Sequence, residues 1–170
     1  MRIFVLIGEE NEIINRKGIV SRFVVASLLI SRSIRRNAIS CIFLNNIKKA
    51  IFLYGSNIRQ LRADESSAWG IIRKAIKSSH KRPHSGVLVE KVNDIEDILK
   101  KFKVSKIFVR SNIGVDVEKA ILGTGSFIYL TSLSSSIHYR EAIPIFFRSN
   151  LRPEQEVVII NILCDRAGIS

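Results

Sequence analysis

The sequence predicts an α/β domain in which helices cover both faces of a mostly parallel sheet. Two observations lead to this prediction. Short apolar runs of strand length alternate with longer segments of helical periodicity, which is typical of parallel sheets. The chain has 170 residues, of which 46% are apolar, so it can fill one core of ordinary size. No repeat or low-complexity linker interrupts the series, so we expect one domain over residues 1–170.

The amino-terminal part is expected to contain three strands and a buried helix. An apolar run at residues 2–7 predicts the first strand. Residues 19–31 are apolar nearly all round, which favours a buried helix. The runs 38–44 and 49–54 predict a hairpin, because Asn45-Asn46 between them tolerates positive φ.

A second helix is expected after Asp64, whose side chain suits the capping position. Its apolar residues, such as Ala68 and Ile72, recur at helical spacing, while Arg73 and Lys77 face away from them. This helix should therefore carry a basic outer face.

The remaining elements continue the alternation. Glu96 follows Asn93 by three residues, as in a capping box, and proline favours the first turn of a helix. In chain order we expect a strand at 87–89, a helix from Asn93, a strand at 107–109, a short helix at 115–122, a strand at 126–130, a brief helix capped by Ser134, a strand at 145–147 and a last helix from Pro153.

The charge of the chain favours a nucleic-acid partner. It carries 27 Lys and Arg against 15 Asp and Glu, a net charge of +12. Fifteen of these bases but only two acids fall between Arg16 and Arg82. A generally solvated cationic surface explains a mild excess, whereas this concentration favours an RNA- or DNA-binding face on the first half.

Several other classes of protein are not supported. The phosphate loop, the dinucleotide-binding glycine motif and the nucleophile elbow are all absent from the sequence. The amino-terminal apolar run is too short for a signal peptide, and no apolar stretch approaches the roughly 18 residues that span a bilayer. We therefore expect a cytoplasmic protein without a membrane partner.

No metal site is expected, because His80, His84 and His138 lack the spacing of metal ligands. Cys41 and Cys164 lie in apolar segments, which favours buried thiols over a zinc site or a redox pair. A long-range disulfide between them remains an alternative if the source is a hyperthermophile.

Several short segments follow one another in a recognisable order. They are the opening Met1-Arg-Ile-Phe4, Ser31-Arg-Ser-Ile-Arg-Arg-Asn37, Ala63-Asp-Glu65 at the start of a helix, Ser85-Gly86 before a strand, and Phe147-Arg-Ser-Asn-Leu-Arg-Pro153 before the last helix. Their order and spacing, over nearly the whole chain, resemble those of the archaeal tRNA pseudouridine N1-methyltransferases, which are α/β-knot enzymes of the SPOUT superfamily.

This resemblance implies a fold, a reaction and partners. The fold would be a parallel sheet whose carboxyl-terminal segment threads a deep trefoil knot, an exception to the general absence of knots. The protein would be a homodimer packed through the knot helices. It would transfer a methyl group from S-adenosyl-L-methionine to N1 of a pseudouridine in the T-loop of tRNA.

The resemblance also implies where the methyl donor binds. In the family the donor lies in a pocket of knot-loop backbone, at the carboxyl ends of strands where ligands of α/β proteins dock. The residues expected to bind it are Leu130, Thr131, Ser132, Leu133, Ser135, Ser149, Asn150 and Leu151.

The family's catalytic and RNA-binding positions can be carried over in the same way. Asp64 and Glu65 match an acidic motif, so they are candidates to accept the pseudouridine N1 proton, although a helix cap is the alternative role of Asp64. The residues expected to contact tRNA phosphates are Arg32, Arg35 and Arg36 of the matched segment, for which a solvated helix end is the alternative, together with Arg73 and Lys77 of the basic helix face.

One departure from the family leaves several functions open. The family usually has a Gly-Asp-x-x-Gly turn where this chain has Thr131-Ser-Leu-Ser-Ser135, and glycine permits close backbone approach to a ligand. The chain is therefore either an active methyltransferase or a degenerate knot protein that binds RNA without catalysis. A nucleic-acid-binding module unrelated to methylation is a third alternative.

Overall fold

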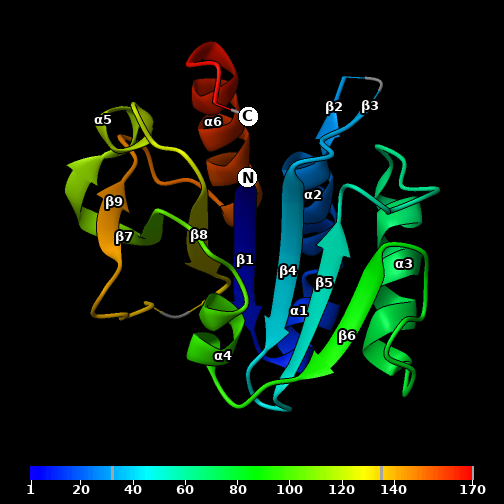
Figure 1. The fold of residues 1–170 in the computed structure, drawn as a ribbon. Coiled ribbons are helices and arrows are strands. Elements are labelled where there is room, and N and C mark those ends of the chain that lie inside the picture. Colours follow the sequence, from blue (N-terminus) through cyan, green and yellow to red (C-terminus); the bar gives the residue numbers. More distant parts are fainter. Residues whose placement is uncertain (32, 135, 170) are drawn as a thin grey trace.

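The computed structural model describes residues 1–31, 33–134 and 136–169 (Figure 1). Its centre is a seven-stranded sheet, accompanied by a two-stranded ribbon of β2 (Leu29–Ile30) and β3 (Ser33–Ile34). From edge to edge the large sheet consists of β6 (Val87–Lys91), β5 (Lys49–Tyr54), β4 (Ala38–Leu44), β1 (Arg2–Gly8), β8 (Phe127–Ser132), β7 (Lys106–Asp116) and β9 (Ile143–Phe146).

The large sheet is mostly parallel, as predicted. The central strand β1 pairs in parallel with both β4 and β8, and β7 pairs in parallel with β8 and β9. The pairs β4–β5 and β5–β6 are antiparallel. The carboxyl ends of β1, β4 and β8 consequently lie together at one end of the sheet, which is the lower end in Figure 1.

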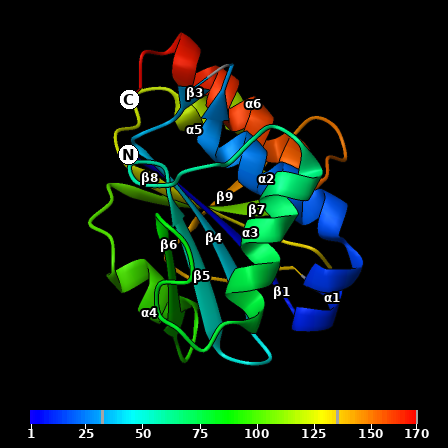
Figure 2. The same cartoon turned by 90° about the vertical axis from the view of Figure 1, so that its right-hand side faces the viewer.

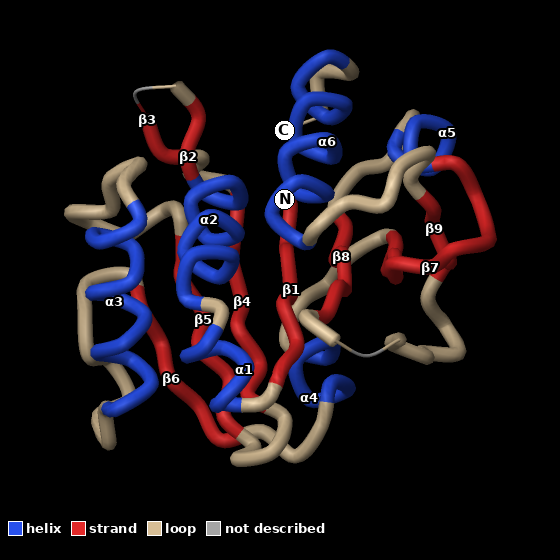
Figure 3. Tube along the Cα trace, turned by 180° about the vertical axis from the view of Figure 1, so that it is seen from behind, coloured by secondary structure: helices blue, strands red, loops and turns tan. Residues whose placement is uncertain are grey.

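Helices lie on both faces of the sheet. They are α1 (Glu10–Asn15), α2 (Lys17–Leu28), α3 (Glu65–Lys77), α4 (Ile95–Lys100), α5 (Val117–Ile121) and α6 (Pro153–Arg166). Figure 3 shows α1, α2, α3 and α6 in front of the sheet when it is seen from behind. Figure 2 shows α4 on the opposite side from α1, α2 and α6.

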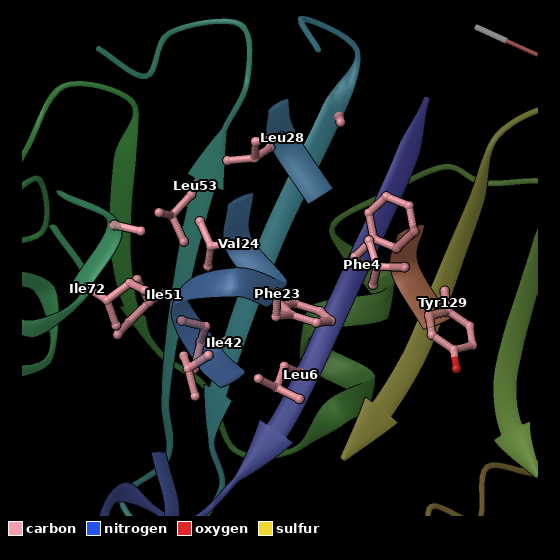
Figure 4. Close-up of a cluster of buried hydrophobic side chains, with 14 of the residues drawn as sticks. Phe4, Leu6, Phe23, Val24, Leu28, Ile42, Ile51, Leu53, Ile72 and Tyr129 are labelled. Atoms are coloured by element: carbon pink, nitrogen blue, oxygen red, sulfur yellow. The ribbon is translucent and has the colours of Figure 1, made fainter. Parts of the chain in front are cut away.

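The core consists of two apolar layers, one on each face of the sheet. Every residue of β1 is buried, because the strand is central and both of its faces are covered. Its side chains alternate between the layers with the period of two of a strand: Phe4 and Leu6 pack with α2, whereas Ile3 and Val5 belong to the layer under α4 (Figure 4).

Several predicted elements are confirmed and others need correction at their ends. The predicted ranges of β4 and β5 are confirmed residue for residue, and the last helix begins at Pro153 as expected. In the hairpin between β4 and β5, however, the positive φ is at Lys48 and not at either asparagine. The buried helix ends at Leu28, because the chain continues into the short strand β2.

Two helix predictions near capping residues are wrong. Helix α4 is capped by Asp94, whose Oδ1 accepts the backbone N–H of Asp97 at 3.1 Å, and not by Asn93. The brief helix expected from Ser134 is not formed by the described residues up to Ala142. The Ser134 hydroxyl instead donates a hydrogen bond to Glu12, which directs this side chain toward α1.

Helix α1 was not predicted. It is six residues long and begins with a capping box, in which the side chains of Glu9 and Glu12 each accept a backbone N–H at the helix start. Its one buried residue is Ile13, so its apolar periodicity is too short to stand out from the sequence.

Both cysteines are free and buried, as expected. Cys41 belongs to the layer under α4, whereas Cys164 belongs to the layer on the other face. The sheet separates the two sulfurs, which excludes the alternative of a disulfide between them. Burial raises the pKa of both thiols, so both favour the neutral form.

Candidate functional site

A cavity of about 840 Å³ lies at the carboxyl end of β8, beside the middle of β7, and we call it the large cavity. Its walls come from residues 109–112, 132–134 and 136–140, together with Ala142 and Pro144. The carboxyl ends of parallel strands are the usual docking place of ligands in α/β proteins. The Ser-rich segment after β8 is therefore one wall of a hollow at the expected place.

A second hollow of about 350 Å³, the small cavity, adjoins the large one. It is lined by residues 110–112 and by the segment 147–150 between β9 and α6. Because residues 110–112 line both hollows, the middle of β7 forms a wall that the two cavities share.

The segment after β8 is held by contacts to the amino-terminal third of the chain. The Leu133 amide donates to the Ile7 carbonyl at 3.1 Å, and the Leu133 carbonyl accepts from Arg16 Nη1 at 2.7 Å. A Cβ on Gly8 would lie 3.2 Å from Leu133 Cδ1, so glycine allows this close approach. The hydrogen bond from Ser134 is the largest influence that lowers the pKa of Glu12.

The serine segment does not depend on glycine for its backbone conformation. None of the residues 131–134 or 136 has a positive φ. At Thr131, the first of the two exchanged glycine positions, the backbone is therefore compatible with a hydroxylated residue, while the second, Ser135, lies outside the described residues.

A buried carboxylate stands behind the shared wall. Glu156, in the first turn of α6, has no exposed surface. It accepts hydrogen bonds from the Tyr129 hydroxyl and from Thr131 Oγ1, each at 2.8 Å. Burial raises the pKa of Glu156, whereas these two hydroxyls and Arg110 act in the opposite direction. The carboxylate joins α6 to the end of β8.

The same carboxylate fixes Arg110 at the junction of the two cavities. Arg110 Nε lies 2.5 Å from Glu156 Oε1, and Arg110 Nη2 donates to Asn150 Oδ1 at 3.1 Å. About a third of the Arg110 side chain remains exposed. The guanidinium is thus oriented from behind and still has N–H groups available to a ligand.

Further basic side chains line these cavities. His138 and Arg140 line the large cavity, and Arg148 lines the small one. The His138 ring nitrogen Nε2 lies 3.4 Å from Ser136 Oγ. Arg148 Nε is 3.1 Å from Asp116 Oδ2, and hydrogen bonding to Arg148 lowers the pKa of that carboxyl group. His138 and Arg140 were not expected at this site from the sequence.

The predicted catalytic acids lie elsewhere. Asp64 caps α3, because its Oδ1 accepts the Ser67 amide at 2.7 Å, which is the alternative role that the sequence left open. Glu65 forms an ion pair with Arg22 of α2. Neither acid lines the large or the small cavity.

The predicted cofactor-binding residues are divided between the two cavities and the core. Ser132 and Leu133 line the large cavity, and Ser149 and Asn150 line the small one. The other residues expected there have different places: Leu130 packs in the layer under α4, the Thr131 hydroxyl is bound to Glu156, Leu151 is half-buried outside both cavities, and Ser135 lies outside the described residues.

The predicted RNA-binding residues also differ from one another. Arg35 is held by both oxygens of Asp165, at 2.8 and 2.7 Å, and is therefore a structural anchor of α6. Arg36 is exposed and donates to the Ser56 carbonyl at 2.8 Å. Arg73 and Lys77 are exposed on α3, as predicted. Arg32 lies outside the described residues.

The described residues offer neither a metal-binding cluster nor a membrane-spanning helix. In residues 1–31, 33–134 and 136–169 no group of three or more His, Cys, Asp or Glu side chains is placed to hold a metal ion. Among the same residues no helix has both the length and the apolar character that crossing a bilayer requires.

Comparison with known proteins finds a similar sequence and a similar fold. No family model matches the chain. The tRNA (pseudouridine(54)-N(1))-methyltransferase of Methanopyrus kandleri is 29% identical over 108 residues, which cover 61% of this chain and 53% of that protein. The match thus spans about half the length of the curated relative. It confirms the resemblance seen in the sequence.

The crystal structure of Archaeoglobus fulgidus Nep1 bound to S-adenosylhomocysteine has a similar fold. The TM-score is 0.63 at 10% sequence identity, and the similarity covers 98% of each chain. At this identity the likeness concerns the fold alone.

Proposed function

We propose that this relative of the pseudouridine N1-methyltransferases is an S-adenosyl-L-methionine-dependent RNA methyltransferase of the SPOUT type. Its proposed acceptor is N1 of a pseudouridine in the T-loop of tRNA, and its proposed location is the cytoplasm. The observation that carries the proposal is the large cavity at the carboxyl end of β8, beside the middle of β7. The Methanopyrus relative supports the choice of tRNA and of pseudouridine, and the product bound to Nep1 supports the choice of methyl donor.

The large cavity fits the methyl donor in size and chemistry. Its volume of about 840 Å³ falls within the range of roughly 300–1,000 Å³ that is usual for small-ligand pockets. Leu133, Ile137 and Pro144 supply apolar surface for a nucleoside, beside hydroxyl groups that can hydrogen-bond to it. Bound there, the donor would supply a methyl group on a cationic sulfur. The attacking nitrogen would bond to the methyl carbon as the carbon–sulfur bond breaks, and S-adenosylhomocysteine would leave as a neutral thioether.

Residues around the large cavity would position the RNA and remove a proton. Arg110, oriented by Glu156, has exposed N–H groups that can hold an RNA phosphate or a base oxygen. Pseudouridine N1 loses a proton when it is methylated. His138 lies in the cavity wall, and histidine is a common general base in enzymes. We therefore propose His138 as proton acceptor in place of Asp64 and Glu65, which lie outside the wall.

The proposed function is tested with two RNA stem-loops and labelled methyl donor. A tRNA T-stem-loop that contains pseudouridine should acquire the methyl group, while the same RNA with uridine should not, because uridine has no free N1. Equal labelling of both RNAs would overturn the pseudouridine specificity, and failure of the folded protein to bind the donor in calorimetry would overturn the methyltransferase itself.

Replacing Ser111 with tryptophan should weaken donor binding at least tenfold, about 1.4 kcal/mol. Ser111 lies in the wall that both cavities share, so an indole would occupy the space proposed for the donor. Ser66→Trp, at an exposed position of α3, is the matched control and should bind like the unaltered chain. Isothermal calorimetry measures the affinities, and equal affinity of both variants would place the donor elsewhere.

A second function, RNA binding without methyl transfer, has one observation in its favour. Both main-chain groups of Leu133 already have partners within the protein, namely Ile7 and Arg16. Fewer backbone groups are thus available to read an adenine in the way that the family does. Detection of labelled methyl groups in the pseudouridine stem-loop would exclude this second function.

We also propose a trefoil knot and a dimer. The course of the chain supports the knot: after β9, at one edge of the sheet, it returns so that Glu156 of α6 reaches Tyr129 and Thr131 in β8. An experimental structure in which residues 147–170 pass through no loop would contradict it. The dimer is supported by a different observation. Val158, Ile159 and Ile162 of α6 are exposed apolar residues that a second copy of the chain could cover.

Replacing Ile162 with aspartate should convert the proposed dimer into a monomer. Ile162 lies on the exposed apolar face of α6, and a carboxylate buried there would be unpaired. Ile14→Asp in α1 is a matched control, because both isoleucines are 44% exposed. Light scattering after gel filtration gives the masses; an unaltered mass for the Ile162 variant would exclude this face as the interface.

A further inference from the structure

A second basic hollow lies at the opposite edge of the sheet, and we call it the lysine hollow. It has a volume of about 640 Å³ and is formed by the β4–β5 turn, the segment after α3 and the end of β6. Four lysines line it: Lys48, Lys49, Lys81 and Lys91. None of them is in the walls of the large or the small cavity.

The charge of this hollow is positive and largely unopposed. Glu90 is the one carboxylate among the residues that line it, so the four lysines leave a net charge of +3, from +4 and −1. Glu90 is already engaged, because Lys101 Nζ lies 2.5 Å from it on one side and Lys81 Nζ 3.6 Å away on the other. The hollow therefore attracts anions.

Not all four amines are equally available. Lys49 is half-buried and its Nζ donates to the Ile76 carbonyl at 2.8 Å, so it also serves the end of α3. Lys48, Lys81 and Lys91 are exposed. Ammonium groups on flexible stems bind phosphates as point charges and need no fixed geometry, which suits contacts to a nucleic-acid backbone.

The position of the lysine hollow relates it to the large cavity. The β4–β5 turn, the end of α3 and the loop after β8 all lie toward the same end of the sheet (Figure 1). The strand order places β6 and β7 five steps apart, or about 24 Å at about 4.8 Å per step. One RNA of several nucleotides can therefore occupy both places.

We propose that the lysine hollow binds the phosphate backbone of the RNA substrate at a distance from the nucleotide in the large cavity. The proposal rests on the proposed function, since it takes that RNA as the ligand. It adds a second contact region, formed by Lys48, Lys81 and Lys91, which the resemblance did not supply. A short RNA that contains only the reacting loop would not reach it.

The test compares Lys81→Gln/Lys91→Gln with the control Lys103→Gln/Lys119→Gln, whose lysines are exposed outside the hollow. Affinity for a full-length tRNA transcript is measured by filter binding at several salt concentrations. The hollow variant should bind about fivefold more weakly, and its salt slope should fall by about one to two, because each lost phosphate contact removes about 0.7–0.9. The control should keep both values, and a seven-nucleotide loop should bind both variants equally.

Different outcomes separate this inference from the proposed function. If the unaltered chain binds the transcript and both double variants match it, the lysine hollow is not an RNA site, while the proposed function stands. If the unaltered chain does not bind the transcript, both are overturned. If it binds the transcript but no methyl donor, the methyltransferase is overturned and the hollow is judged by the two variants alone.

Discussion

Replacing Glu156 with alanine is expected to lower the free energy of unfolding by about 3 kcal/mol. The change leaves the hydroxyls of Tyr129 and Thr131 without their acceptor and removes the partner of Arg110. Removing one member of a buried ion pair typically costs about 3–5 kcal/mol, and we take the lower end because Arg110 is a third exposed and can be solvated. Urea unfolding measures the change.

Two controls separate this effect from a general loss of charge. Glu118→Ala removes an acid from a largely exposed position and should change stability by less than about 0.5 kcal/mol. A double-mutant cycle with Arg110→Ala should give a coupling of about 1 kcal/mol or more, since the two side chains are in contact. Independent effects of the two changes would contradict the ion pair.

The pH dependence of the Glu156 contribution has a definite sign. Burial raises the pKa of Glu156 above its ordinary value of 4.5, so the folded chain binds this proton more tightly than the unfolded chain does. This contribution is therefore fully present below about pH 4.5 and is lost as pH rises through the folded-state pKa. Relative to Glu156→Gln, the unaltered chain should lose stability over that interval of rising pH.

Replacing Asp165 with alanine is expected to destabilise the chain by about 3 kcal/mol. Asp165 Oδ1 lies 2.8 Å from Arg2 Nη1, and Arg35 holds both of its oxygens. The Arg2 side chain is only 4% exposed, so the substitution leaves a buried guanidinium without its carboxylate. Glu96→Ala, which removes an exposed pair with Lys100, is the control and should have little effect.

Acid should weaken the Asp165 contribution. Burial acts to raise the pKa of Asp165, but hydrogen bonds and charge from Arg35 and Arg2 outweigh it, so the pKa is lowered below its ordinary 3.8. The stabilisation is therefore present above about pH 3.8 and is lost as pH falls through the folded-state pKa. Urea unfolding of the unaltered chain and Asp165→Ala should converge in that acidic interval; a constant difference would contradict this assignment.

The Asp165 contacts also change how an Arg35 variant must be interpreted. Arg35 was expected to bind tRNA, but its guanidinium is used to hold α6. A loss of RNA binding in Arg35→Ala would thus follow from a weakened helix contact. Arg36 remains exposed and is the better position for testing a phosphate contact.

Much of the fold follows from local patterns in the sequence. The predicted ranges of β4 and β5 match the structure residue for residue, because an apolar run and a turn define each strand without reference to distant residues. The helix expected from Ser134 was predicted wrongly, because the position of Ser134 depends on a distant residue. Its hydroxyl bonds to Glu12, which is 122 positions away, and no local rule contains that contact.

Only part of the candidate site could be predicted from the sequence. Ser132, Leu133, Ser149 and Asn150 line the adjoining cavities, because they lie at or after the ends of β8 and β9, the two strands that flank β7. Arg110 was missed, since its role depends on a buried carboxylate 46 positions later in the chain. Pairings of this kind are fixed by topology, and composition or periodicity does not reveal them.

The contact between Arg2 and Asp165 has a consequence for synthesis of the protein. A ribosome that adds about 5–20 residues per second needs roughly 8 to 33 seconds to proceed from one partner to the other, 163 positions later. During that interval the amino-terminal strand carries a guanidinium with no carboxylate to neutralise it in the core. The nascent chain can therefore complete the packing around Arg2 only after Asp165 has been synthesised.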